Sequence, residues 1–232
     1  MKRQWCIGQL DSRYLARLEA LLRLYAKPYD PQQPVICFDE RPCFLIGDKL
    51  EPLAMSSGQV GKEHYAYEKN GSCALLVAIE PLTGRRLAQV HAQRRKVEFA
   101  HFMRQLAYLY PEADVIHVVL DNLNTHDRSA FYEQFVAAEA LALAERFQFH
   151  YTPTSASWLN MVEIELSALA RLCLNRRIPT RQQLATEVLA LVAERHDKRT
   201  RIDWQFSVQD ARHVFNKHYQ RLNPLNQKYH KT

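Results

Sequence analysis

The chain has 232 residues, of which 47% are hydrophobic and 24% charged, as expected for one large globular domain. Its longest apolar runs are far shorter than the ~18 residues of a membrane-spanning helix, so no membrane partner is expected. The six glycines form no Gly-rich phosphate loop, and the five cysteines and ten histidines show no zinc-ligand spacing. The odd cysteine count fits a reducing cytoplasm.

The net charge of +6 is unevenly distributed along the chain. Residues 171–232 carry 13 Lys or Arg and 5 Asp or Glu, a net charge of +8. The preceding part carries 18 basic and 20 acidic residues, a net charge of −2. A basic surface favours an anionic partner, with nucleic acid first. A solvated helical surface would give the same count.

In chain order, helices and strands alternate through the middle of the sequence. Apolar residues at helical spacing predict a first helix ending near Tyr25, and three prolines then lead into a strand. Short apolar runs predict strands at residues 35–38, 43–46, 73–79, 86–91, 115–120 and 147–151. Helices are predicted at residues 96–110, 127–146 and 158–175, and after capping-box patterns at Thr180 and Ser207. Residues 47–71 lack a period and predict a long surface segment.

This order of elements predicts an α/β fold. One hairpin over residues 73–91 and several βα crossovers indicate a mixed sheet with helices on both faces and further helices at the C-terminus. We expect a lead-in helix at residues 1–33 and an α/β core at residues 34–178. The basic helices and tail at residues 179–232 belong to the same domain or form an appendage.

Two of the predicted strands are followed directly by an acid. Val35 begins an apolar run that leads into Asp39 and Glu40, and a second run leads into Asp121. If these strands are neighbours, both Asp carboxylates project at one edge of the sheet. Magnesium prefers such hard oxygen ligands, and two ions can clamp the attacking and leaving oxygens of a phosphodiester. A single Asp after a strand is more often a turn former or a helix cap, so the combination carries the argument.

A third acid comes from the helix predicted at residues 158–175. Glu163 lies beside the apolar stripe that packs on the sheet, and we select it as the third ligand. Glu165 points to nearly the opposite side and is expected to be solvated. Glu40 is expected to brace Asp39, and His126 to contact a phosphate or orient a water molecule, although an isolated histidine is more often structural.

Three motifs in this order resemble those of a known family: Asp39-Glu40, Leu120-Asp121-Asn122-x-x-x-His126 and Ser157-Trp158-Leu159-Asn160-Met161-Val162-Glu163. They resemble the catalytic motifs of DDE transposases, in particular the bacterial mariner-type branch known as the insertion sequence six-thirty family. The resemblance covers roughly residues 5–220. It implies a ribonuclease-H-like fold, two Mg²⁺ or Mn²⁺ ions, DNA strand cleavage by activated water, and transfer of the new 3′-hydroxyl into target DNA.

The resemblance also implies roles for single residues and for partners. Asp39, Asp121 and Glu163 would be the catalytic metal ligands, with Asn122 and Asn160 as supporting groups beside Glu40 and His126. Met161 replaces the proline that this motif often has, and 42 residues separate the last two acids, more than the compact mariner spacing. A homodimer in a complex with transposon ends and target DNA is implied.

Full-length family members carry N-terminal helix-turn-helix domains that bind the element ends. This chain begins about where their catalytic domain begins, so we expect a separate helix-turn-helix protein or an upstream reading frame to supply that function. Two other functions stay open at this point. One is a nuclease of the same fold without strand transfer, and the other is an inactive DNA-binding remnant.

Candidate DNA contacts are basic and aromatic. The basic C-terminal part provides phosphate contacts through Arg176, Arg177, Arg181, Lys198, Arg199 and Arg201. The segment at residues 47–71 mixes basic and aromatic side chains suited to nucleic acid: Lys62, His64, Tyr65, Tyr67 and Lys69. A plain surface loop is an equal alternative for this segment.

Overall fold

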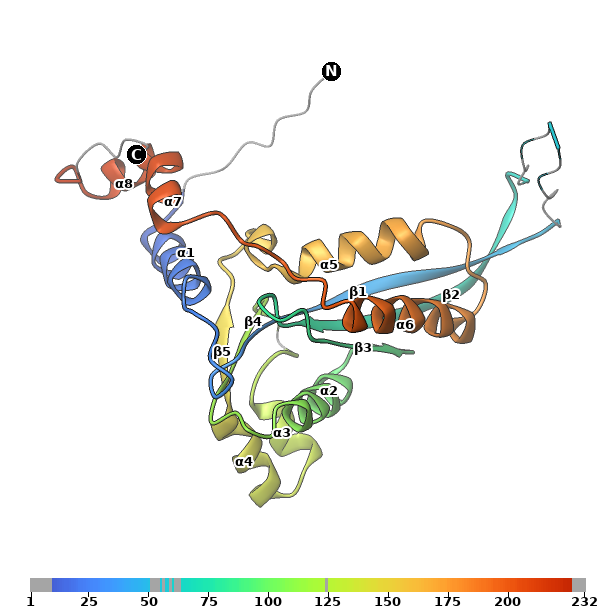
Figure 1. Ribbon diagram of the computed structural model, residues 1–232, viewed down its shortest axis with the longest axis horizontal. Helices are drawn as coiled ribbons and strands as arrows, with labels where there is room; N and C mark the ends of the chain where they lie inside the picture. The colour runs from blue at the N-terminus through green and yellow to red at the C-terminus, as the bar shows by residue number, and fades with distance from the viewer. Residues whose placement is uncertain are drawn as a thin grey trace.

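The core of the protein is a five-stranded mixed sheet (Figure 1). The computed structural model describes residues 10–50, 55, 57–58, 60, 64–123 and 125–226, so Lys62 lies outside the described residues. The strands are β1 (Val35–Asp48), β2 (Tyr67–Ile79), β3 (Arg86–His91), β4 (Ile116–Leu120) and β5 (Phe147–Tyr151). Their order is β3-β2-β1-β4-β5. β2 pairs antiparallel with both β3 and β1, whereas β4 pairs parallel with both β1 and β5.

Helices cover both faces of this sheet, as the sequence predicted (Figure 1). One face packs on α2 (Lys96–Leu109), α3 (Ser129–Gln134) and α4 (Ala137–Arg146). The other packs on α1 (Ser12–Tyr25), α5 (Val162–Leu169), α6 (Arg181–Asp197) and α7 (Val208–Val214), and α8 (Asn216–Leu222) follows α7. In the described part of the chain, no helix combines the length and apolar character needed to cross a bilayer.

The alternation of side chains along the strands divides the interior into two cores. In β1, Ile36 and Phe38 face α2, whereas Cys37 faces the side of α1 and α5. All three side chains are fully buried. A strand buried on both faces therefore has a continuous apolar sequence, and this explains the run that begins at Val35.

The largest difference from the sequence prediction is that β1 is one strand of 14 residues. We expected two strands, at residues 35–38 and 43–46, with Asp39 ending the first. Instead, Asp39 to Pro42 pair in unbroken register with β2, opposite Val77 to Ala74. The backbone of β2 supplies a partner regardless of side-chain polarity, so the two acids lie inside the strand.

The surface segment predicted at residues 47–71 is shorter than expected because β2 already begins at Tyr67. The register between β1 and β2 shifts between Phe44 and Ile46, where β2 contains one extra residue. Gly71 has a φ of +103° beside this bulge, a conformation that favours glycine. The Asn-Gly pair at residues 70–71 therefore forms a bulge within a strand.

Two predicted helices are also interrupted. The helix expected at residues 127–146 is divided between α3 and α4, because Phe135 and Val136 are extended. The ring of Phe135 lies 4.7 Å from the guanidinium of Arg104, which holds this turn against α2. The helix expected at residues 158–175 begins as a 3-10 turn at Ser157–Leu159, continues as α5, and ends as a π-helical segment at Ala170–Leu174.

The α2 core provides a test of the packing. Phe102 is fully buried and its ring centroid lies 5.0 Å from that of Phe38, whereas Tyr108 on the same helix is 71% exposed. We predict that Phe102→Ala lowers the free energy of unfolding by about 3–5 kcal/mol, measured by urea denaturation. Tyr108→Ala should change it by less than about 0.5 kcal/mol. Equal effects of the two substitutions would contradict this arrangement.

Candidate active site

The parallel pairing of β1 with β4 places two acids at the same level of the sheet. Val35 pairs with His117 and Cys37 with Val119, a constant offset of 82 residues. The same offset puts Asp39 level with Asp121, which directly follows the last residue of β4. Since β4 ends there, the edge of β1 beside Asp39 is not covered by a strand on that side.

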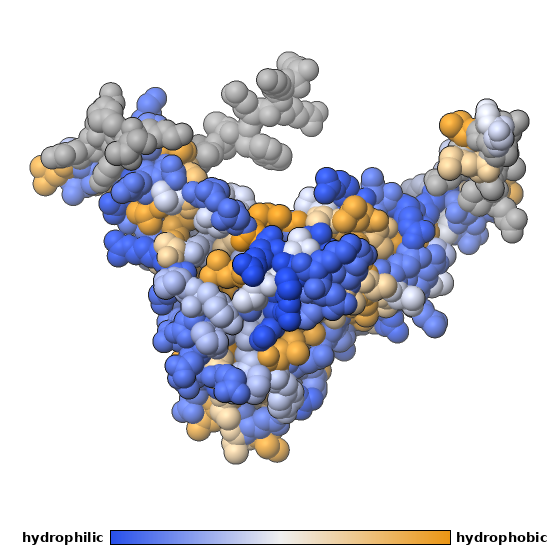
Figure 2. All heavy atoms as spheres, viewed as in Figure 1, coloured by the Kyte–Doolittle hydropathy of each residue, from blue (hydrophilic) through white to orange (hydrophobic). Residues whose placement is uncertain are grey.

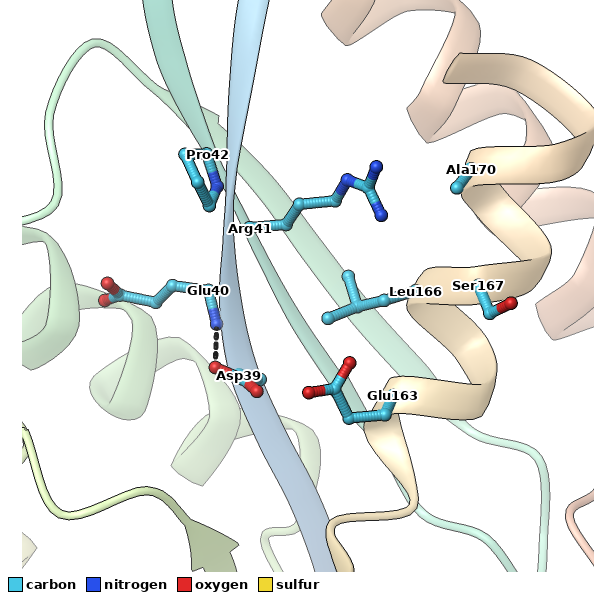
Figure 3. Close-up of a pocket in the computed structure, with 8 residues that line it drawn as sticks. All are labelled: Asp39, Glu40, Arg41, Pro42, Glu163, Leu166, Ser167 and Ala170. Carbon is cyan, nitrogen blue, oxygen red and sulfur yellow. Dashed lines mark hydrogen bonds between the residues drawn. The ribbon is translucent and has the colours of Figure 1, made fainter. Parts of the chain in front are cut away.

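Helix α5 brings the third acid to Asp39. Figure 3 shows the carboxylate of Glu163 directed from the first turn of α5 towards Asp39 on β1. Both residues line a pocket of about 260 Å³, together with Glu40, Arg41, Pro42, Leu166, Ser167 and Ala170. Burial, together with the nearby charges of Asp121 and Glu163, raises the pKa of Asp39 to about 7. Burial is the largest cause of this raised pKa, and repulsion from the two neighbouring carboxylates, which a cation would relieve, adds to it.

Glu40 points away from Asp39 because neighbouring residues of a strand face opposite sides. Its backbone N–H donates to Asp39 Oδ1 at 2.7 Å, while its buried carboxylate lies 3.2 Å from His126 Nε2. The other ring nitrogen, Nδ1 of His126, lies 2.5 Å from Asp121 Oδ1. His126 therefore lies between Glu40 on β1 and Asp121 at the end of β4.

The His126 ring is fully buried, with its centroid 5.3 Å from that of Phe38 and 5.0 Å from that of Phe99. Burial by itself would lower the pKa of His126, but its interactions with Asp121 and Glu40 raise the pKa to about 9. Nδ1 hydrogen-bonds Asp121, whereas Nε2 lies at ion-pair distance from Glu40 without a hydrogen bond. His126 orients Asp121 rather than lining the pocket beside Asp39.

The two asparagines of the predicted site differ in their surroundings. Asn160 is buried and donates from Nδ2 to the backbone oxygen of Phe38 at 2.8 Å. It also accepts from the N–H of Val162 at 3.4 Å, so it attaches the start of α5 to β1 beside Asp39. Asn122 is exposed and is not part of the pocket lining.

Glu165 is completely buried, and the expectation that it is solvated was wrong. Its carboxylate accepts from Arg86 Nε at 2.8 Å and Nη2 at 3.0 Å, and from Arg195 Nε at 2.9 Å and Nη2 at 2.8 Å. Arg86 lies on β3 and Arg195 on α6, so this carboxylate joins three elements. Burial would raise the pKa of Glu165, but the two guanidinium groups outweigh it and lower that pKa. The interaction fixes the rotation of α5 and thereby the direction of Glu163.

Three of the six basic residues predicted to contact DNA are paired with acids of the chain. Arg176 pairs with Glu187 and Lys198 with Glu194. Arg177 Nη1 lies 2.5 Å from Asp48 Oδ1, and its guanidinium also lies 5.7 Å from the centroid of the Tyr67 ring. The other three are exposed: Arg181, Arg199 and Arg201. The six do not form one free cationic surface.

In the segment at residues 47–71, two aromatic side chains are open to solvent. Tyr65 is 85% exposed and Tyr67 45% exposed. The rings of His64 and Tyr65 lie 4.5 Å apart. Lys69 is exposed on β2. These side chains are accessible, and their contact with nucleic acid stays a prediction.

The donor set suits a hard divalent cation. Asp39, Asp121 and Glu163 supply carboxylate oxygens, which Mg²⁺ and Mn²⁺ accept together with water. The charges of the three interact, as the pKa of Asp39 shows. Over the described ranges, no three metal-binding side chains are close enough to enclose an ion as they stand. The carboxylate oxygens thus suit such a cation in their chemistry, although the side chains do not enclose one in their present positions.

The fold and the acidic pocket define an α/β protein of the ribonuclease-H-like class, with Asp39 and Glu163 in one pocket and Asp121 at the end of the adjacent strand. The chain belongs to the DDE superfamily endonucleases, whose family model matches residues 34–185. The resemblance expected from the three motifs is confirmed at this level, while the insertion-sequence branch stays a prediction. A search among curated protein sequences finds no match.

Solved structures of a transposase share this fold. The Mos1 mariner paired end complex with Mn has a TM-score of 0.57 at 13% identity, over 99% of this chain and 68% of the other. The corresponding complex with Mg has a TM-score of 0.54 at 13% identity, over 99% and 67%. The Mos1 strand transfer complex has a TM-score of 0.53 at 12% identity, over 99% and 67%. At such low identity, the likeness concerns the ribonuclease-H-like fold.

The buried network around Glu165 gives a prediction about stability. Glu165→Gln should lower the free energy of unfolding by about 3–5 kcal/mol at pH 7, because it leaves Arg86 buried without its counter-charge. In the native protein, the lowered pKa of Glu165 adds stability above the unfolded pKa of about 4.3, and this stability is lost as the pH falls below it. The variant should lack this part of the acid dependence.

The matched control for this prediction is Glu194→Gln on α6, which removes an exposed ion pair with Lys198. Exposed pairs contribute little, so its urea midpoint should equal that of the native protein. If Glu165→Gln were as stable as this control, the network would not hold α5 in place.

Proposed function

We propose that the chain is the catalytic part of a transposase that cleaves DNA strands and joins a 3′-hydroxyl end to target DNA. The observation that carries the proposal is the placement of Asp39 and Glu163 in one pocket, with Asp121 level with Asp39 at the end of β4. The family membership supports the same chemistry. Two bound Mg²⁺ or Mn²⁺ ions would supply activation of the attacking oxygen and stabilisation of the leaving oxygen.

The protein side of this mechanism is positioning. Asp39 and Glu163 would hold the cations from the two walls of the pocket, and Asp121 would complete the ligand set. The protonated ring of His126 holds Asp121 and Glu40, so the Asp121 carboxylate is oriented before the cations bind. Asn160 anchors the start of α5 to β1 and so sets the position of Glu163.

The partners in this proposal are DNA and a second copy of the chain. The structural neighbours include a Mos1 transposase paired-end complex with left transposon end, and by analogy this chain would act on transposon ends as a homodimer. Recognition of the ends would come from a helix-turn-helix protein or an upstream frame. We place the chain in the bacterial mariner-type branch, associated with the nucleoid.

Single substitutions in the carboxylates test the metal site. We predict that Asp39→Asn, Asp121→Asn and Glu163→Gln each lower the rate of Mn²⁺-dependent nicking of supercoiled DNA by more than about 100-fold. Loss of a residue that only orients a metal ligand already costs about 10–100-fold, and loss of the ligand itself should cost more. Glu133→Gln, an exposed acid of α3, is the control and should nick like the native protein. Nicking that survives all three substitutions would contradict the assignment.

Strand joining separates the proposed transposase from the two alternatives. A duplex with a free 3′-hydroxyl at a transposon end should become covalently linked to a second duplex in the presence of Mn²⁺, as seen on a denaturing gel. Cleavage without joining would indicate a nuclease of this fold. Binding without cleavage would indicate an inactive remnant.

A further inference from the structure

Arg41 is a basic side chain in the lining of the acidic pocket. Arg41 follows Asp39 by two positions on β1, so the two side chains project to the same face of the sheet. Figure 3 shows the guanidinium of Arg41 extended towards α5, on the side of Ser167 and Ala170 rather than of Glu163. Arg41 thus forms one wall of the pocket, farther along β1 than the carboxylates.

The guanidinium of Arg41 has no acidic partner among the residues that the structure describes. Other arginines near the sheet are neutralised by carboxylates: Arg86 and Arg195 by Glu165, Arg104 by Glu139, and Arg177 by Asp48. Arg41 is half-buried and adjacent to Asp39 in the pocket, yet it forms an ion pair with neither Asp39 nor Glu163. Its planar fork of donors is available to an anion from outside the chain.

The surroundings of Arg41 indicate what kind of anion it binds. The pocket of about 260 Å³ is smaller than the ~300–1,000 Å³ of typical small-molecule sites, which suits a segment of a polymer. The exposed Ser167 lines the same pocket from the opposite wall, on α5. A guanidinium without an acidic partner matches the non-bridging oxygens of a phosphodiester.

We propose that Arg41 binds the DNA phosphate next to the one being cleaved and so positions the strand across the carboxylates. This inference rests on the proposed function, because the cations held by Asp39 and Glu163 would place the cleaved phosphate. Arg41 is in this view a positioning residue. Its charge also offsets the acids of the pocket, which would otherwise repel a phosphate.

The salt dependence of DNA binding tests this role. Fluorescence anisotropy with a labelled duplex, in Ca²⁺ and between about 50 and 200 mM salt, gives the slope of log affinity against log salt. Loss of one phosphate contact in Arg41→Gln should make the slope shallower by about 0.9, which is about a 3.5-fold smaller loss of affinity over this range. Arg41→Lys keeps the charge and should keep the native slope.

Arg104→Gln is the matched control, because it removes the same charge from α2 on the opposite face of the sheet. Its slope should equal that of the native protein. An unchanged slope in Arg41→Gln, or an equal change in Arg104→Gln, would overturn the proposal. If Arg41 only covered Leu166, Arg41→Gln would lower the thermal midpoint and leave the slope unchanged.

The measurement does not depend on catalysis. If the native protein failed to cleave DNA but Arg41→Gln still changed the slope, the proposed reaction would fail and the phosphate contact would stand. If the native protein cleaved DNA and Arg41→Gln had the native slope and nicking rate, the contact would fail and the reaction would stand.

Discussion

The register between β1 and β4 is the constraint on which the candidate site depends. The offset of 82 residues brings Asp39 level with Asp121, and the end of β4 leaves the edge of β1 uncovered at that level. Because side chains alternate along a strand, a slip by one residue would move Asp39 to the face of α2 and Glu40 to the face of α5. The buried apolar side chains Ile36, Cys37 and Phe38 resist such a slip, since each is matched to its own core.

The second requirement is a fixed helix α5, and polar groups supply it. Asn160 holds the beginning of the helix against the carbonyl of Phe38, and Glu165 holds its middle between Arg86 and Arg195. A buried ion pair adds little net stability compared with apolar packing, but it permits few alternative orientations. Here that restriction directs Glu163 into the pocket. The position of one carboxylate is thus decided by charges on β3 and α6.

Several basic side chains of the C-terminal part form ion pairs with acids of the same chain. The C-terminal part is rich in Lys and Arg, but Arg176, Arg177 and Lys198 pair with acids of the chain and Arg195 is directed inward. A count of basic residues therefore overstates the cationic surface offered to DNA. The arginine best placed for a phosphate is Arg41, in the part of the sequence whose net charge is slightly negative.

Local patterns in the sequence determined much of the fold and the three acids of the candidate site. The strands at residues 86–91 and 147–151 have the predicted bounds, and α2 ends one residue earlier than predicted, because apolar periodicity and turn residues act over a few neighbours. The motifs around Asp39, Asp121 and Glu163 were likewise visible without the structure.

Tertiary structure alone decided what depends on distant partners. β1 continues through Asp39 and Glu40 because β2 pairs with its backbone, and Glu165 is buried because its two arginines lie 79 and 30 residues away in the chain. Only the fold shows that the adjacent acids Asp39 and Glu40 have different surroundings. Asp39 faces the pocket, whereas Glu40 lies beside His126. A side chain's charge and spacing are local properties, but its burial and its counter-charge are set by residues that only the folded chain brings together.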